Sequence, residues 1–412
     1  MNKFRLFILI VLVPLPVLGQ NDQTDAIYRR SSLYTMMIDE SSIKYADEIA
    51  KTFNGTPIPD KFNDHNLTER VIPNGIPAGM LKREEKIALQ EQNITNYLET
   101  NYVARQIVAK WFDRKSNGCF NMDLIVDRGK YNATEMDVQF ALSTERGLAL
   151  LGDAGEELIH NTFIVVNDFD FVSKEEVAET GKKGLSLIKD VANKLDIEVN
   201  NKKLEMADVT LTTVGKGYVV RTTSYLYQID WNDSVAAVFY NDYWMDKNSV
   251  NKARKVAFDN SDIFKLKYIG YEVAWADLQA TVFTKKTEEE LVDIATVRAI
   301  DHVIAKLQRK YEIFRTKTPL YSNDPLSAKI GLKEGLEKGD KFEVLEQVMD
   351  RKGKTSYKRR GIVRVDKDHI WDNRFMAEEE HQLTDNLIPT EDYTIFKGDS
   401  KYYAGWLIRQ IN

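Results

Sequence analysis

The spacing of hydrophobic residues changes several times along the chain, and each spacing predicts a different kind of element. Apolar residues recur every three or four positions in residues 41–53, 83–112 and 287–311, which predicts amphipathic helices. Residues 162–166 form an unbroken run dominated by β-branched and aromatic side chains, typical of a strand buried on both faces. The same criteria predict strands at 26–38 and 122–126, helices at 134–159 and 173–195, and a long loop at 56–77.

Shorter runs rich in β-branched and aromatic residues follow in the middle of the chain, separated by turn residues. They predict strands at 209–214, 218–229, 235–240 and 264–275, which we expect to form an antiparallel meander. Gly270 interrupts the last of these strands and predicts a β-bulge. A helix, a buried strand and another helix, followed by a meander, predict an α+β fold with a mixed α/β layer.

The last part of the chain, from residue 316, contains short strands and tight turns. Alternating hydrophobicity predicts strands at 342–348, 357–365 and 402–411. Such strands predict a small all-β module. We therefore expect a mixed α/β domain at 20–315, with a possible subdivision near residue 200, and a β module at 316–412.

The beginning of the chain has the pattern of a secretory signal peptide. Lys3 and Arg5 precede an apolar run from Leu6 to Leu18, and the small Gly19 closes the pattern. This run is shorter than the roughly 20 apolar residues that span a bilayer. We expect removal of residues 1–19, export of the mature chain, and no transmembrane segment in that chain.

Charge and cysteine content narrow the class of protein. With 57 Lys and Arg against 63 Asp and Glu, the formal net charge is −6, so the chain lacks the basic character of a general nucleic-acid binder. Its one cysteine, Cys119, cannot form an internal disulfide. The 5 histidines show no zinc-binding spacing, and neither a Gly-x-Ser-x-Gly elbow nor a phosphate-binding glycine loop occurs.

The β module opens with a pattern of its own at residues 331–344. Gly335-Leu336, two residues, Gly339-Asp340, one residue, Phe342, one residue and Val344 follow one another. This pattern resembles the opening of the small SH3-like barrels at the ends of bacterial cell-envelope proteins. With its signal peptide and α/β body, the chain is similar to uncharacterised exported proteins of the Bacteroidetes. The resemblance covers roughly the last quarter of the chain, and it implies a periplasmic or extracellular location in a Gram-negative bacterium and a binding role.

The same residues predict local structure without any family. Gly335 and Gly339 permit a positive φ in tight turns, whereas Phe342 and Val344 alternate onto one inner face.

Two carboxylates, Asp168 and Asp170, directly follow the buried strand at 162–166. Residues at i and i+2 of an extended chain point to the same side, and α/β proteins bind ligands at the carboxyl ends of strands. The pair could therefore hold Mg²⁺ or Ca²⁺ through oxygen. It also resembles the first motif of haloacid-dehalogenase phosphatases, which implies Asp168 as nucleophile and Asp170 as general acid/base, although the residues that normally follow the pair are absent. The alternative is that Asp170 and Ser173 cap the next helix while Asp168 is solvated.

A basic cluster lies on the predicted hairpin of the β module and comprises Lys352, Lys354, Lys358, Arg359, Arg360 and Arg364. It could contact an acidic partner, lipid headgroups or polysaccharide carboxylates. The alternative is an exposed hairpin whose charges are balanced by nearby acidic residues.

Aromatic residues recur in the predicted meander, among them Tyr227, Trp231 and Trp244. They could line a groove for a sugar or a peptide, or they could form core. We therefore predict an exported, non-enzymatic cell-envelope protein that binds an envelope protein, a glycan or a small ligand and uses no cofactor. The alternative is a metal-assisted, phosphatase-like hydrolase that uses Asp168 and Asp170 with Mg²⁺ or Ca²⁺.

Overall fold

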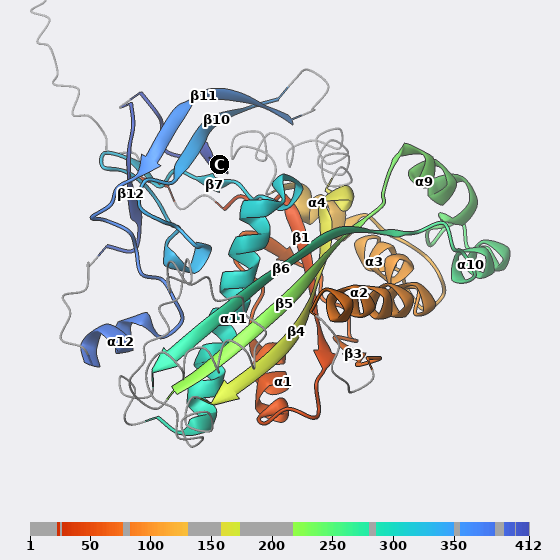
Figure 1. The fold of residues 1–412 in the computed structure, drawn as a ribbon. Coiled ribbons are helices and arrows are strands. Elements are labelled where there is room, and N and C mark those ends of the chain that lie inside the picture. The colour runs from red at the N-terminus through yellow and green to blue at the C-terminus, as the bar shows by residue number, and fades with distance from the viewer. Residues whose placement is uncertain are drawn as a thin grey trace, which may run out of the picture.

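The computed structural model describes residues 23–24, 27–76, 83–130, 158–173, 217–279, 286–349, 355–383, 391–399 and 401–411 (Figure 1). Several predicted features lie outside these ranges: the signal peptide, most of the helices at 134–159 and 173–195, the strand at 209–214, and Lys352 and Lys354. Within the described ranges, no helix combines the length and the apolar character that crossing a bilayer requires.

A six-stranded mixed sheet forms the centre of the larger part of the protein (Figure 1). Its strands are β1 (Ser31–Asp39), β2 (Phe62–Asp64), β3 (Val71–Pro73), β4 (Thr162–Ser173), β5 (Gly217–Ile229) and β6 (Leu266–Gln279). Their order is β2-β1-β4-β5-β6, and β3 pairs with β1 farther along that strand. β1 runs parallel to β2, β3 and β4, whereas β4, β5 and β6 are antiparallel. The predicted mixed layer is confirmed, and the predicted strands at 218–229 and 264–275 are confirmed as the antiparallel pair β5 and β6; together they form one sheet that changes from parallel to antiparallel at β4.

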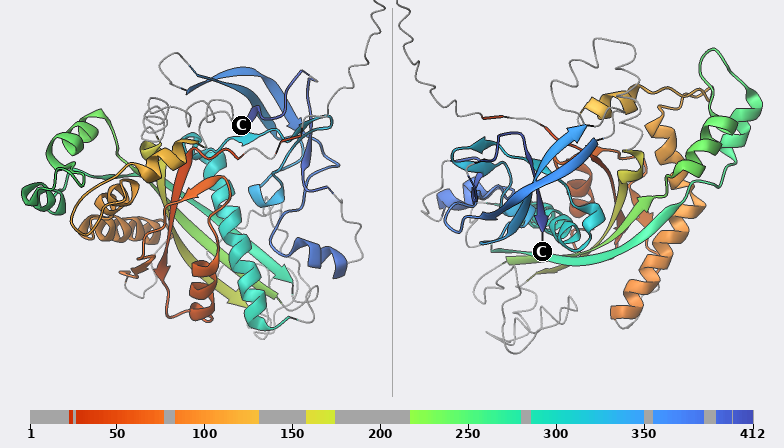
Figure 2. Two further views of the ribbon diagram at one scale, coloured as in Figure 1. Left: turned by 180° about the vertical axis from the view of Figure 1, so that it is seen from behind. Right: turned by 90° about the horizontal axis from the view of Figure 1, so that it is seen from above.

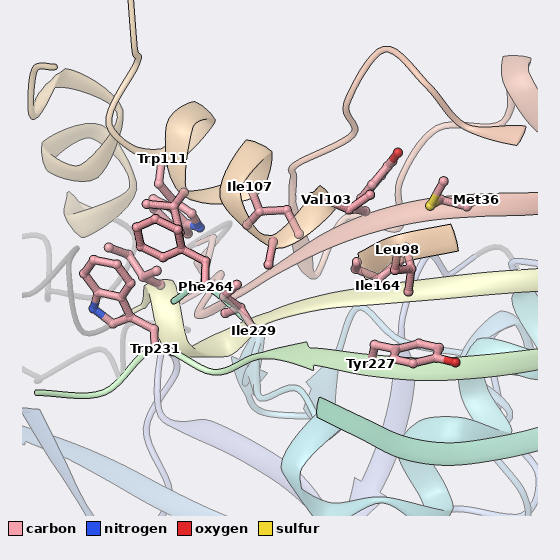
Figure 3. Packing of buried hydrophobic residues seen from close by; sticks show 14 of the residues in the cluster. Met36, Leu98, Val103, Ile107, Trp111, Ile164, Tyr227, Ile229, Trp231 and Phe264 are labelled. Carbon is pink, nitrogen blue, oxygen red and sulfur yellow. The ribbon is translucent and has the colours of Figure 1, made fainter. Parts of the chain in front are cut away.

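Helices cover both faces of this sheet because its central strands are apolar on both sides. In β4, Ile164 and Val166 belong to one hydrophobic core and Phe163 and Val165 to the other. The elements that cover the two faces are α2 (Arg83–Thr100) and α3 (Val103–Trp111) over the first, and α1 (Ala46–Gly55) and α11 (Glu288–Lys310) over the second. Figure 3 shows the first core, in which side chains from the strands meet those from α2 and α3.

Two predictions that depend on local geometry are confirmed: the capping box at the start of α11 and the β-bulge at Gly270. At the start of α11, the Thr287 hydroxyl accepts a hydrogen bond from the Glu290 N–H (3.3 Å), and the Glu290 carboxylate accepts one from the Thr287 N–H (2.8 Å). Gly270 has φ 152°, and the register of β5 against β6 shifts beside it, as the predicted bulge requires.

Other expectations are wrong. The single helix predicted at 83–112 is two helices, because Tyr102 adopts a left-handed conformation with φ 52° between α2 and α3. The strand predicted at 122–126 is the helix α4 (Asp123–Lys130). The loop predicted at 56–77 contributes the short parallel strands β2 and β3.

The strand predicted at 235–240 is also wrong, because this segment is helical. Asn232 caps the helix, since its side-chain oxygen accepts hydrogen bonds from the N–H groups of Ser234 and Val235. The segment between β5 and β6 contains three helical elements, α9 (Asp233–Val238), the π-helix η2 (Phe239–Tyr243) and α10 (Lys252–Asp259). Their aromatic side chains pack beside Phe112, which stacks on Phe239 with ring centroids 4.3 Å apart.

The chain continues into a seven-stranded antiparallel sheet that curls into a half-barrel, called here the half-barrel (residues 318–411). Its strands are β7 (Thr318–Pro319), β8 (Ser322–Asn323), β9 (Leu326–Ala328), β10 (Lys341–Met349), β11 (Thr355–Val365), β12 (Thr394–Lys397) and β13 (Leu407–Ile411), in the order β7-β13-β10-β11-β12-β9-β8. As predicted, Phe342 and Val344 are buried, and Gly335 and Gly339 have φ values of 68° and 87°. The predicted C-terminal all-β module is confirmed as this half-barrel, which also carries the short helix α12 (Ala377–Leu383).

Helix α11 joins the half-barrel to the rest of the protein, called here the body (residues 31–310). Figure 2 shows the half-barrel on the α11 side of the sheet and α2 on the opposite side. Arg309 of α11 pairs with Asp340 at 3.1 Å, and Arg298 pairs with Glu380 at 2.7 Å. α11 therefore contributes to the core of the body and to the surface that holds the half-barrel.

The described N-terminal residues 23–24 and 27–30, called here the N-terminal segment, also pack against the half-barrel. The Thr24 N–H donates to the Tyr321 carbonyl at 3.0 Å, and the hydroxyls of Tyr28 and Tyr357 are hydrogen-bonded to each other. The predicted division into 20–315 and 316–412 stays a prediction, but the contacts of this segment cross it.

Candidate functional site

Asp168 and Asp170 lie within β4 rather than after it. The strand continues to Ser173, so the expectation that it ends at residue 166 is wrong. Both side chains point to the face that α2 covers, as the i, i+2 spacing predicts. Asp168 is 4% exposed and Asp170 is partly exposed, so only the second reaches solvent to any extent.

Three charged residues from other elements join the two aspartates. Arg221, opposite Asp170 on β5, pairs with it at 3.1 Å, and Lys86 in the first turn of α2 approaches the same carboxylate at 3.8 Å. Glu40, directly after β1, forms a side-chain hydrogen bond with Asp168. These five residues are called here the carboxylate cluster.

The carboxylate cluster holds a proton at neutral pH. Burial, together with the negative charges of Asp170 and Glu40 and against the positive charge of Lys86, raises the pKa of Asp168 to about 8. Burial also raises the pKa of Glu40, its hydrogen-bond partner. When Glu40 and Asp168 share one proton, the pair carries one negative charge. Together with the negative charge of Asp170, it balances the two positive charges of Lys86 and Arg221.

This neutrality bears on the predicted metal site. A divalent cation prefers oxygen ligands that carry negative charge, but here two cations already occupy the neighbourhood of Asp170. In the part of the chain that the structure describes, no three His, Cys, Asp or Glu side chains are grouped so as to hold a metal ion. A Mg²⁺ or Ca²⁺ site at Asp168 and Asp170 stays a prediction, and the arrangement favours holding a proton.

The basic hairpin is balanced by acidic residues of the neighbouring strand where it is described. Lys358, Arg359 and Arg360 are exposed on β11. Arg360 forms an ion pair with Glu346, and Arg359 lies 3.8 Å from Glu343. The binding role predicted for this hairpin stays a prediction.

The predicted aromatic residues contribute to the core of the body. Tyr227 and Trp231 are buried, and the Tyr227 hydroxyl is hydrogen-bonded to that of Thr95 at 3.0 Å. Trp244 is partly buried and stacks on Phe120 with centroids 5.9 Å apart. Their burial matches the core alternative that the sequence left open.

A cleft of about 1140 Å³ lies between the body, the N-terminal segment and the half-barrel. Its wall combines apolar and aromatic side chains with charged ones, including Ile27 from the N-terminal segment and Trp371 and Phe375 from the half-barrel. Ile27 and Phe375 are 56% and 42% exposed. The sequence pattern did not single out these residues, because they come from segments that are distant along the chain.

Charged side chains on the half-barrel side of the cleft are fixed by one another. Arg374 donates two hydrogen bonds to Asp372, at 2.8 and 2.7 Å, and the His381 ring lies 2.9 Å from the same carboxylate. Although burial acts in the opposite direction, these hydrogen bonds and the charge of Arg374 hold the pKa of Asp372 below its usual value.

A second cavity of about 270 Å³, called here the inner cavity, adjoins the cleft. The two share Tyr28, Lys61 and Lys317 in their linings, so these side chains lie at the boundary between them. No protein-family model matches the chain, and no curated protein is significantly similar to it. Function has to be inferred from the geometry of these sites.

Proposed function

We propose that the chain is an exported, non-enzymatic protein of a bacterial cell envelope that binds a ligand in the cleft between body and half-barrel. The observation that carries the proposal is the cleft itself, which combines a large volume with exposed apolar side chains and convergent polar groups. Export rests on the pattern of residues 1–19, and the envelope setting rests on the resemblance of residues 331–344.

The size and lining of the cleft favour an oligosaccharide or a ligand of similar size. Ligand pockets commonly measure roughly 300–1,000 Å³, and the cleft, at about 1140 Å³, is slightly larger than that range. Aromatic rings such as Trp371 and Tyr321 supply flat surfaces, and neighbouring charged and amide groups supply hydrogen bonds.

The carboxylate cluster gives less support to the alternative of a phosphatase-like hydrolase. A carboxylate that attacks phosphorus must be ionised, whereas a pKa of about 8 keeps Asp168 protonated at neutral pH. Asp170, the predicted general acid/base, is paired with Arg221.

The proposal is tested by calorimetric titration of the mature chain with maltohexaose and with oligogalacturonate, a neutral and an acidic oligosaccharide. We expect one of these probes to bind, and Phe375→Ser to weaken that binding about tenfold through loss of apolar contact area. Val256→Ser is the matched control, because Val256 is 56% exposed on α10, away from the cleft. If neither the oligosaccharides nor the sugars and phosphates used below bind, or if both variants behave like the wild type, the proposal is overturned.

A further inference from the structure

The lining of the inner cavity carries an excess of positive charge. Its charged residues are Arg30, Lys61, Arg315, Lys317 and Arg409, with Glu312 as the single carboxylate. They come from the N-terminal segment, the turn before β2, the connection between α11 and β7, and β13. The cavity is therefore formed only where the body, the N-terminal segment and the half-barrel meet.

Three of these five cations already have strong partners. Arg409 donates to the Glu343 carboxylate at 2.6 Å. Arg315 donates to two main-chain carbonyls at the end of α11, at 3.1 and 2.8 Å. Arg30 donates to the Tyr357 hydroxyl at 2.9 Å. The charge of Arg409 is thus compensated by Glu343, and the guanidinium group of Arg315 is hydrogen-bonded to the C-terminal end of α11.

Lys61 and Lys317 have no such compensation. In the described ranges, no carboxylate lies within ion-pair distance of either ammonium group, and Lys317 lies over the ring of Tyr357 at 4.3 Å. Burial, with the positive charges of Arg30 and Arg409 and against Glu343, lowers the pKa of Lys317 to about 8. Burial, with the positive charge of Lys333 and against Glu334 and Asp60, also lowers the pKa of Lys61. Two half-buried ammonium groups at one boundary therefore have no carboxylate at ion-pair distance among the described residues.

The number of uncompensated charges indicates the chemical class of the ligand. A phosphate monoester carries about 1.5 to 2 negative charges at neutral pH, whereas a carboxylate carries one. Hydroxyl and amide groups of Ser31, Asn161 and Tyr28 in the same lining can donate to the remaining phosphate oxygens.

The size of the inner cavity limits it to part of a ligand. Its volume of about 270 Å³ is small for a whole ligand, but it adjoins the cleft through Tyr28, Lys61 and Lys317. We propose that the inner cavity holds the phosphate group of a phosphorylated sugar, whose remainder lies in the cleft. This inference rests on the proposed function and names the ligand class for the same site.

The test is calorimetric titration of the mature chain at about pH 7 with inorganic phosphate, glucose 6-phosphate, glucuronate and glucose. We expect glucose 6-phosphate to bind most tightly, and inorganic phosphate to compete with it. Lys317→Gln and Lys61→Gln should each weaken binding of glucose 6-phosphate about ten- to hundredfold, because each removes a charged hydrogen-bond donor. Lys338→Gln, at an exposed lysine of the half-barrel, is the matched control and should bind as the wild type does.

Two results would overturn the inference and leave the proposed function standing. One is tight binding of a neutral oligosaccharide in the cleft without binding of either phosphate. The other is equal affinity for glucuronate and glucose 6-phosphate, which would remove the argument for a dianion. Circular dichroism of the two lysine variants shows whether they are folded. If both are unfolded, Lys317→Arg, which keeps the charge, must retain binding of glucose 6-phosphate, and loss of that binding in the folded Lys317→Arg protein overturns the inference.

Discussion

The carboxylate cluster and the inner cavity are both groups of charged residues held between elements, but they differ in charge balance. In the cluster, a retained proton and the cations Lys86 and Arg221 neutralise three carboxylic acids. In the lining of the inner cavity, five cations face one carboxylate, and Lys61 and Lys317 form no ion pair among the described residues, although Glu334, Asp60 and Glu343 act on them from farther away.

The carboxylate cluster balances its own charges, although Oδ1 of Asp168 and Nε of Arg221 are buried without a hydrogen-bond partner, whereas the proposed ligand would balance the charges of the inner cavity. Paired buried charges leave little for a bound molecule to gain, whereas desolvated charges without a counterion favour binding of an anion. The sequence predicts the two aspartates as candidate site residues because carboxylates commonly act in catalysis and metal binding. In the structure, Lys86, Arg221 and Glu40 surround them.

The largest expected effect comes from removing a cation of the carboxylate cluster. Arg221→Met leaves the carboxylate of Asp170 without its closest partner, and we expect the free energy of unfolding to fall by about 3 kcal/mol at neutral pH. Urea unfolding measures this change. Arg360→Met, which breaks the exposed pair with Glu346, should cost about 0.5 kcal/mol. Equal losses in the two variants would contradict the view that the cluster depends on its internal balance.

The next effect concerns the proton of Asp168. Its pKa is about 8 in the folded protein and about 3.9 in an unfolded chain. Because the folded state binds the proton more tightly, the free energy of unfolding should fall as pH rises from about 4 to about 8, by at most about 1.4 kcal/mol per pH unit.

Asp168→Asn mimics the neutral carboxyl group, so it should flatten this dependence and exceed the wild type by about 2 kcal/mol at about pH 8. Urea unfolding at several pH values checks it, and a residual slope is expected from Asp301, whose pKa burial raises to about 7. An unchanged slope in the variant would show that Asp168 does not hold the retained proton.

The smallest effect has the opposite sign and belongs to the inner cavity. Lys317 has a pKa of about 8 in the folded protein and about 10.4 when unfolded, so its charge opposes folding below about pH 8 and ceases to do so as pH rises towards about 10. Lys317→Met should therefore stabilise the ligand-free protein by about 1 kcal/mol at neutral pH. Thermal unfolding at neutral and alkaline pH, with Lys338→Met as control, measures the difference; destabilisation at neutral pH would show that Lys317 is already compensated.

Much of the fold could be predicted from the sequence because its signals are local. β5, β6 and α11 are confirmed, since alternation, a glycine bulge and a capping box act within a few residues. The strand predicted at 235–240 is wrong. Its β-branched and aromatic residues suit a strand, but the cap at Asn232 and packing against Phe112 make the segment helical.

The sites could be predicted only in part, because they depend on which distant segments meet. Asp168 was recognised from its position after an apolar run, but Glu40 joins it only because β1 and β4 pair in parallel. The cleft and the inner cavity combine segments from opposite ends of the described chain, and no sequence spacing relates Lys61 to Lys317.

The contact between the N-terminal segment and the half-barrel has a consequence for the order of assembly. Tyr28 and Tyr357, which are hydrogen-bonded, are separated by 329 positions. Domains of a growing chain fold from the N-terminus as they emerge. Arg30 and Lys61 are therefore synthesised long before Arg409, which completes the wall of the inner cavity. A chain that stops short of β13 lacks Arg409, so the wall of the inner cavity stays incomplete until that strand has been made.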